Sequence, residues 1–254
     1  MAYIYLEFTP MSAIKFALFG VAIILVIIGI YDYLNTRRLI KIGVMQTAET
    51  LGFERAVETP KLRLLIIGDS SGVGVGATDP NESIAGRIAS DFPEAEITNL
   101  AVSGSKVKDA LEQLDQLTTE DQYDLIVLQI GGNDIVRFTK LADLERDLAT
   151  LLELAKQHSD KVVQLTSGNV GTSQLLPFGT RWLFTLRTKQ VREIFLQVNA
   201  QAGTHYVDLY RIRAVDPYVT NPTKYYSADF FHPSGAGYGV WYERVQPVIK
   251  KLFE

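Results

Sequence analysis

The chain contains no cysteine, and its three histidines, His158, His205 and His232, lie far apart in the sequence. Without cysteine the protein has no disulfide, no thiolate metal site and no cysteine nucleophile. Scattered histidines do not favour a histidine-rich zinc site, and we expect neither a metal nor a cofactor. A long run of lysine and arginine is also missing and the net charge is -4, which argues against nucleic acid as the partner.

The 254 residues, of which 47% are hydrophobic and 21% charged, suffice for one large domain plus an appendage. From residue 61 onward, apolar runs of strand length alternate with helix-like segments. This βα alternation predicts an α/β fold with a five-stranded parallel sheet covered on both faces. The expected strands are Leu62–Ile67, Glu96–Leu100, Leu125–Ile130, Val162–Thr166 and Tyr206–Leu209. The expected helices are Ser83–Ser90, Val107–Leu117, Leu141–His158, Arg181–Ala202 and Ala236–Phe253.

Ahead of this domain, Phe16–Tyr31 is an apolar run without charges. As a helix it covers about 24 Å, and an extension to residues 13–34 covers about 33 Å, enough for a hydrocarbon core of about 30 Å. We therefore predict one membrane anchor in residues 1–34, with a span over about 13–34, in which Lys15 snorkels and Asp32 lies near the interface. A cleaved signal peptide is the rival interpretation, although no small-x-small cleavage site follows. A buried core helix is the third.

Basic residues follow the expected span, at Arg37, Arg38 and Lys41. Counting them places the rest of a single-pass chain in the cytoplasm, with the periplasm as the alternative. We expect a partly helical juxtamembrane connector over residues 35–60, and its basic start suits anionic headgroups. The catalytic domain is expected over residues 61–254.

Polar residues follow several of the expected strands, and ligands bind beyond the carboxyl ends of the strands in open α/β sheets. Ser70 comes directly after the first strand, where it is a candidate nucleophile that needs a neighbouring base to take its proton. His232 is the candidate base, because imidazole titrates near neutral pH. Asp229 is the candidate partner that orients the imidazole. Four blocks carry these residues and their neighbours: Gly68-Asp69-Ser70, Asn99–Gly104, Gly131–Asp134 and Asp229–Pro233.

A serine nucleophile also needs donors for the oxyanion of its tetrahedral intermediate. The backbone N–H groups of Ser70 and Gly104 and the side-chain amide of Asn133 are the candidates. A glycine at 104 allows the backbone to approach a ligand closely. We expect Asp69 to bond to nearby backbone N–H groups in a structural role. His158 and His205 are also expected to be structural.

The four blocks together resemble the SGNH/GDSL hydrolase family, in its bacterial esterase and lipase branch. The matching positions are Gly68-Asp69-Ser70, Gly104, Gly132-Asn133-Asp134 and Asp229-x-x-His232. The resemblance covers residues 62–254 and implies a three-layer α/β/α, flavodoxin-like fold. It also implies metal-free ester hydrolysis by a triad of Ser70, Asp229 and His232, with Ser70, Gly104 and Asn133 at the oxyanion hole. The chain departs from the family pattern at Ser71, where an apolar residue is usual.

We therefore predict a serine hydrolase of carboxylic esters or thioesters. The anchor and the apolar residues 175–184 suggest a lipid-derived acyl chain. A carbohydrate O-acetyl esterase is the alternative within the same chemistry. A nucleotide-binding module is an alternative of another class, because residues 72–77 fit G-x-G-x-x-A after a strand. A membrane-tethered binding protein with an inactive site is the third.

Overall fold

The fold is that of a computed structural model, which describes residues 10–254. Five parallel strands form one sheet in the order β2-β1-β3-β4-β5, the order typical of flavodoxin-like sheets. The expected fold class is confirmed, and each strand lies within two residues of its predicted bounds. The strands are β1 (Leu62–Gly68), β2 (Ala95–Asn99), β3 (Leu125–Gln129), β4 (Val162–Leu165) and β5 (His205–Val207).

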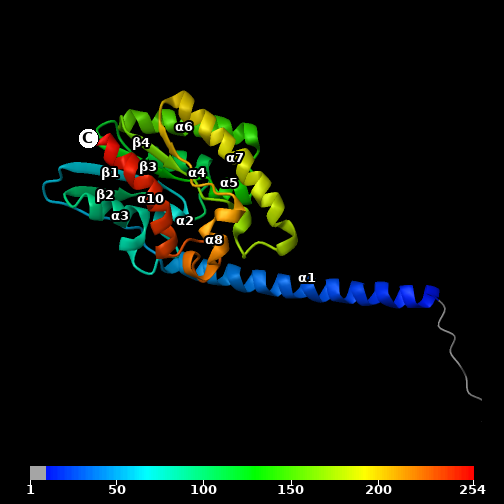
Figure 1. The fold of residues 1–254 in the computed structure, drawn as a ribbon. Coiled ribbons are helices and arrows are strands. Elements are labelled where there is room, and N and C mark those ends of the chain that lie inside the picture. The colour runs from blue at the N-terminus through cyan, green and yellow to red at the C-terminus, as the bar shows by residue number, and fades with distance from the viewer. Residues whose placement is uncertain (1–9) are drawn as a thin grey trace, which may run out of the picture.

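Helices cover both faces of the sheet, as Figure 1 shows. Alternation along β1 explains the two layers, since successive side chains of a strand point to opposite faces. Leu64 and Ile66 belong to one core, whose helices are α3 (Ile84–Asp91) and α10 (Gly235–Leu252). Leu65 and Ile67 belong to the other core. Its helices are α4 (Val107–Leu114), α6 (Leu141–His158) and α7 (Arg181–Ala202).

Short helices that the sequence did not predict lie in the loops. They are too short to show an apolar period. Two of them directly follow strands: α2 (Ser70–Val73) follows β1, and α5 (Gly132–Val136) follows β3. The others are α8 (Pro217–Thr220), α9 (Pro222–Tyr225) and the 3-10 turns η1 (Pro80–Glu82), η2 (Val170–Thr172), η3 (Phe178–Thr180) and η4 (Arg213–Val215).

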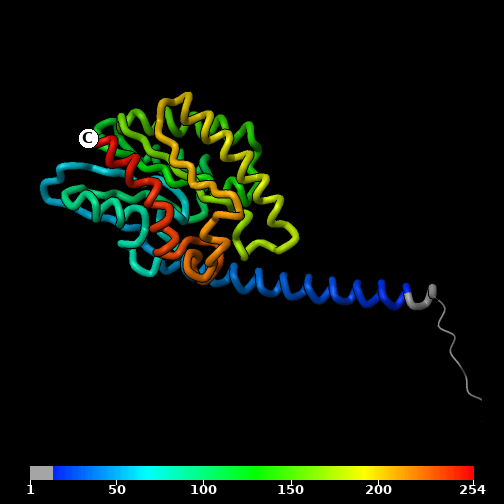
Figure 2. The backbone as a smooth tube through the Cα atoms, viewed as in Figure 1, coloured from blue at the N-terminus to red at the C-terminus, as the bar shows by residue number. Residues whose placement is uncertain are grey.

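The N-terminal helix α1 (Pro10–Glu49) runs without a break past the expected end of the span at residue 34. Figure 1 and Figure 2 show it passing along the domain and then projecting from it. Within the described residues it is the one helix long and apolar enough to cross a membrane. Residues 1–9 of the predicted anchor lie outside the described residues.

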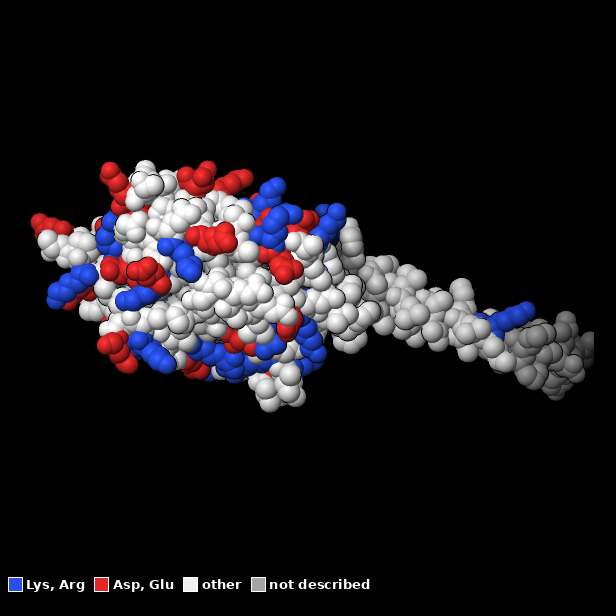
Figure 3. Space-filling view, turned by 90° about the horizontal axis from the view of Figure 1, so that it is seen from above, with Lys and Arg blue, Asp and Glu red and all other residues white. Residues whose placement is uncertain are grey.

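The two halves of α1 differ in burial. Side chains from Ile14 to Tyr31 are exposed on every side apart from half-buried Gly20, and Figure 3 shows the projecting part almost free of charge. From Asp32 onward the buried and half-buried positions recur at helical spacing. These positions, which we call the docking stripe, are 32, 35, 36, 39, 42, 43, 46, 47 and 50. A helix that packs on a globular surface has one such face, so the second half of α1 belongs to the domain's surface.

Beyond α1 the chain lies on the edge of the sheet. Arg55 forms an antiparallel bridge with Ile97 of β2. Its guanidinium donates to the carbonyl of Ala95 at 2.9 Å and to that of Ala89 at 2.8 Å. These bonds fix residues 50–60 against the domain rather than leaving them as a free tether. The expected division at residues 34 and 60 remains a prediction.

Candidate active site

The candidate nucleophile lies where β1 turns into α2. Asp69 is the N-cap of α2, and Ser70 is its first residue. The Asp69 carboxylate accepts hydrogen bonds from the Ser71 backbone N–H at 2.8 Å and the Ser71 hydroxyl at 2.7 Å. Ser71, the residue that departs from the family pattern, therefore adds a second donor to the cap. Asp69 bonds locally, as expected.

Burial raises the pKa of Asp69 to about 6, against the hydrogen bonds from Ser71, which oppose the shift. The turn between β1 and α2 is also packed closely against β3. A Cβ on Gly68 would run into the backbone carbonyl of Gln129, so only glycine fits between β1 and β3 at this point. The turn that carries Ser70, the candidate nucleophile, is therefore held by the Asp69 cap and by β3.

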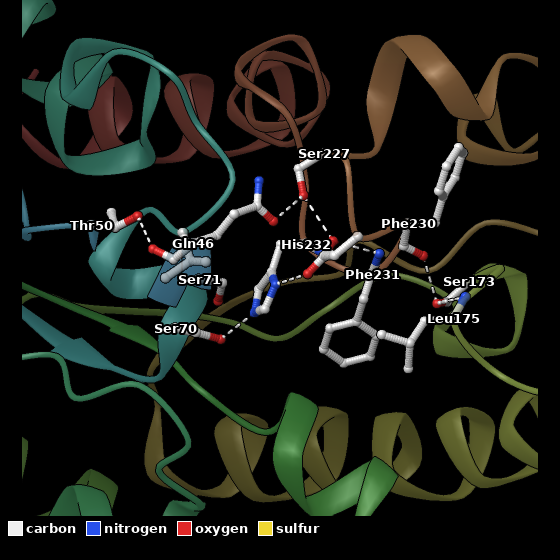
Figure 4. A network of polar contacts seen from close by, with 12 residues as sticks. Gln46, Thr50, Ser70, Ser71, Ser173, Leu175, Ser227, Phe230, Phe231 and His232 are labelled. Atoms are coloured by element: carbon white, nitrogen blue, oxygen red, sulfur yellow. Dashed lines mark hydrogen bonds and ion pairs between the residues drawn. The ribbon is translucent and has the colours of Figure 1, made fainter. Parts of the chain in front are cut away.

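Ser70, His232 and Asp229 form one hydrogen-bonded chain, shown in Figure 4. His232 Nε2 lies 2.9 Å from Ser70 Oγ. His232 Nδ1 lies 2.6 Å from Asp229 Oδ2. The fold thus brings together residues 162 positions apart in the sequence, in the contacts that a nucleophile, a base and its orienting carboxylate need.

Asp229 is fully buried, and its second oxygen is held by three donors. Oδ1 accepts from the Ser227 hydroxyl at 2.8 Å and from the backbone N–H groups of Phe231 and His232 at 2.9 Å each. Burial alone would raise the pKa of Asp229, but the contact with His232 and these bonds outweigh it, and the pKa lies below its ordinary value. The carboxylate is therefore ionised at neutral pH.

Of the oxyanion candidates, Ser70 and Asn133 line the same cavity. Asn133, in α5, donates its side-chain amide to the carbonyl of Ser105 at 3.0 Å, which ties the two loops together. Gly104, with φ +88°, lines the adjoining hollow beside Arg137 and not the cavity at Ser70.

The other two histidines lie away from this cavity. His158 bonds to the carbonyl of Asp121, and His205 is exposed at the start of β5.

The cavity at Ser70 is walled by aromatic and polar side chains. Tyr218, Tyr226 and Trp241 supply the aromatic part. Within the described chain, Asn169 Nδ2, Ser167 Oγ and the Tyr218 hydroxyl are buried and lack a hydrogen-bond partner. Buried polar atoms are normally paired, so these three unpaired atoms stand out among the residues that line the cavity. Among residues 10–254, no three acidic or histidine side chains group to hold a metal.

Sequence reasoning missed two residues that support this geometry, Gln113 and Ser227. The amide of Gln113 accepts from the Gly68 N–H at 2.9 Å and donates to the Gly68 carbonyl at 3.0 Å. A glutamine on the apolar face of the helix 107–114 was the available signal. Ser227, which donates to Asp229, lies in an irregular loop and had no signal in the sequence.

Comparisons with known proteins identify the family and agree with the fold. Residues 66–240 match the model of the GDSL-like lipase/acylhydrolase family. The esterase TesA of Pseudomonas aeruginosa is 27% identical over 193 residues, which cover 74% of this chain and 88% of TesA. A crystal structure of TesA superposes with a TM-score of 0.58 at 25% identity, covering 75% of this chain and 99% of that one. A variant of Axe2, an acetyl xylan esterase from Geobacillus stearothermophilus, shares the fold at 18% identity, with a TM-score of 0.57 and coverage of 78% and 95%.

Proposed function

The chain belongs to the GDSL-like lipase/acylhydrolase family, and from this premise we propose that it hydrolyses acyl esters through an acyl-enzyme on Ser70. The observation that carries the proposal is the hydrogen-bonded chain from Ser70 through His232 to Asp229. The family makes the protein an esterase or lipase; the triad, the oxyanion donors and the substrate are the parts proposed.

In the first step His232 Nε2 takes the Ser70 proton as Oγ attacks the carbonyl carbon. Asp229 holds the ring so that Nε2 faces Ser70, and it stabilises the imidazolium. We propose that the oxyanion receives hydrogen bonds from the Ser70 N–H and the Asn133 amide, which line the cavity. The Gly104 N–H, which lines the adjoining hollow, would join them as a third donor only after its loop moves. His232 then gives its proton to the leaving alcohol. Water attacks the acyl-enzyme with His232 as base, which releases the acid and restores the Ser70 hydroxyl.

An active-site phosphonate tests the nucleophile. The full chain should lose turnover of an aryl ester and gain one phosphonyl group on Ser70. Ser70→Ala should show neither turnover nor labelling, while the matched neighbour variant Ser71→Ala should still be labelled. Labelling of the Ser70→Ala protein, or turnover retained by it, would remove Ser70 from the mechanism.

We further propose that the substrates are lipid-derived acyl esters and that residues 14–34 anchor the protein in a membrane. The apolar, exposed half of α1 and the aromatic wall of the cavity support this. A cleaved signal peptide would remove the exposed half, so an N-terminal tag retained in the membrane fraction tests the anchor. By the count of basic residues we propose a cytoplasmic catalytic domain, and a fusion reporter after the span tests its side.

A carbohydrate O-acetyl esterase is the second candidate, favoured by the unpartnered polar atoms of Asn169 and Tyr218 in the cavity. Activity on aryl esters of increasing chain length separates the two: an optimum at acetate would contradict the lipid substrate. The nucleotide module finds no support, because the glycine-rich loop is packed against the catalytic loop. A Cβ on Gly76 would meet Ser227 Cβ at 2.9 Å and His232 Cβ at 3.1 Å.

A further inference from the structure

A short apolar surface lies beside α1 at the start of α7. In this segment, residues 178–186, which we call the rim segment, Phe178 is 75%, Trp182 68% and Leu186 49% exposed. Trp182 and Leu186 lie four residues apart in α7 and so share one face of the helix, and Phe178 lies in the 3-10 turn η3 just before it. The guanidinium of Arg181 lies 5.6 Å from the centre of the Phe178 ring. Aromatic side chains with a basic neighbour are typical of the membrane–water interface.

The rim segment is hydrogen-bonded to α1 at the point where its fully exposed half ends. The backbone N–H of Phe178 donates to Asp32 Oδ2 at 3.0 Å. The Thr36 hydroxyl donates to the carbonyl of Leu175 at 3.3 Å. Residues 14–31 measure about 27 Å as a helix, close to the hydrocarbon thickness of about 30 Å. If they fill the bilayer core, Asp32 lies at its boundary and Phe178 lies at the same depth. Figure 1 shows the turn before α7 facing the projecting part of α1.

The same stretch of chain also reaches the catalytic cavity. Ser173 lines the cavity; its hydroxyl donates to the Phe230 carbonyl at 2.7 Å and accepts from the Leu175 N–H at 3.2 Å (Figure 4). Only four residues thus lie between Ser173, in the wall of the cavity, and Phe178. The chain that leaves the wall of the cavity at Ser173 therefore leads directly into the rim segment.

We propose that the rim segment is a second membrane contact, seated among the lipid headgroups beside the span, and that its occupant is the bilayer surface. The contact rests on the anchoring proposed above. It places the mouth of the active site at the membrane, which is the position an enzyme needs to take acyl lipids from the bilayer.

The two tryptophans of the chain allow a direct test. Trp182 is exposed in the rim segment, whereas Trp241 is 7% exposed. The full-length protein is placed in phosphatidylcholine vesicles with brominated acyl chains, which quench nearby indoles. We expect strong quenching in Trp241→Phe, where Trp182 remains, and little in Trp182→Phe. Protein that floats with the vesicles but keeps Trp182 unquenched overturns the contact alone. Protein that does not float overturns the anchor and the contact together, and leaves the esterase chemistry to the phosphonate test.

A different observation concerns the inner end of the docking stripe. Leu39 is 1% exposed, and Gly43 lies one turn further along. A Cβ on Gly43 would stand 2.8 Å from Asp229 Oδ2, the oxygen that faces His232. Glycine at 43 is therefore what allows the helix backbone to pack against the catalytic carboxylate.

Gln46, on the same face of α1, continues this contact. Its side-chain amide oxygen lies 3.2 Å from Ser227 Oγ, which in turn donates to Asp229 Oδ1 at 2.8 Å. A hydroxyl has one proton, and the carboxylate is the stronger acceptor. The two ends of an amide are exchanged by a flip, which turns the nitrogen of Gln46 towards Ser227 and leaves the Ser227 proton for the carboxylate. Gln46 then donates to Ser227, and Ser227 donates to Asp229.

We infer that Gly43 and Gln46 are positioning residues for Asp229, so that the helix that carries the span is also part of the support of the triad. This inference rests on the proposed triad. It predicts that the orientation of the acid–base pair depends on α1 being docked, although α1 supplies no group that touches the substrate.

Gly43→Ala is the decisive variant, and Gly29→Ala is its matched control, because nothing lies within 4 Å of a Cβ at Gly29. Both add one methyl group and the same helix propensity. With a soluble ester and the full chain in detergent, we expect kcat to fall about 10- to 100-fold in Gly43→Ala with KM unchanged, since small displacements of catalytic groups have effects of this size. Phosphonate labelling should slow in parallel, and Gly29→Ala should match wild type.

Gln46→Met keeps the side-chain volume without the amide, and we expect about a two- to tenfold fall in kcat with an unchanged melting temperature. Equal kcat in Gly43→Ala and Gly29→Ala, or a change in melting temperature without a change in kcat, would overturn the positioning role. Full turnover in Ser70→Ala would instead overturn the triad itself.

Discussion

Two buried carboxylates lie on opposite sides of the cleft, and their pKa values shift in opposite directions. On the sheet side, burial raises the pKa of Asp69 to about 6, with only Ser71 donating to it. On the helix side, Asp229 is also buried but receives donors on both oxygens, and its pKa lies below the ordinary value. Burial opposes charge at both sites, and at Asp229 the direct contact with His232, together with the further donors, outweighs it.

The two carboxylates also differ in where the residues that hold them lie in the sequence. The sheet side is built from neighbours in sequence, with Asp69 capping the helix that begins at Ser70. The helix side is assembled from a loop near the C-terminus, and α1 packs against it at Gly43. We expect changes on the sheet side to act in the same way in detergent and in a bilayer, and changes around α1 to depend on the membrane.

Replacing each of the two aspartates by asparagine should give the largest difference in kcat. Asp229→Asn should lower kcat about 10⁴-fold, because the amide leaves His232 in the wrong tautomer. Asp69→Asn keeps an oxygen for the Ser71 donors, and its kcat should stay within about tenfold of wild type. Steady-state turnover of a soluble ester measures both. Similar losses in the two variants would remove the distinction between an orienting and a capping carboxylate.

Loss of Asn133, the proposed oxyanion donor, should have the next largest effect on turnover. Asn133→Ala should lower turnover roughly 10²- to 10³-fold with little change in KM, because the amide proton that is not bonded to the Ser105 carbonyl acts on the developing charge. The loss should be equal in detergent and in vesicles, since Asn133 stands on the sheet side. Unchanged turnover would remove Asn133 from the oxyanion hole.

The pKa of Asp69 predicts a pH dependence of stability. A carboxyl whose pKa is raised in the fold from 3.8 to about 6 stabilises the protein below its unfolded pKa, and this contribution is lost as the pH rises through 6. Between pH 4 and pH 7, the free energy of unfolding of wild type should therefore fall by up to about 3 kcal/mol relative to Asp69→Asn. Denaturant unfolding of the two proteins across this range measures it, and parallel profiles would contradict the raised pKa.

A substitution in the rim segment should have the smallest effect on turnover, and this effect should depend on the substrate. Trp182→Ala should lower hydrolysis of an acyl lipid within vesicles severalfold, because a buried aromatic contact with the bilayer is lost. Turnover of a water-soluble ester by the same variant should not change. Leu51→Ala is a control, since Leu51 is 81% exposed just beyond the docked helix. Equal losses on both substrates would point to the cavity instead of the membrane.

Much of the fold followed from local patterns. The bounds of α6 and α7 match the predicted segments at both ends, because their apolar period is long and regular. The helices α2 and α5 escaped prediction, since four or five residues carry no period and their start depends on a cap or a turn. Residues 35–60 were predicted to be a partly helical connector, and they are helical to Glu49 and irregular from residue 50 to residue 60.

The sequence by itself determined the strands, the long helices and the chemical types at Ser70, Asn133, Asp229 and His232. These depend on side-chain periodicity and on residues that follow strands directly. Only the tertiary structure decided that Gly43 and Gln46 meet the catalytic loop, that Gln113 holds the end of β1, and that Gly104 lines the neighbouring hollow. The physical reason is that each such contact joins segments that are distant in the chain. The sequence around one partner does not indicate the other, because the two meet only when the sheet and α1 have packed.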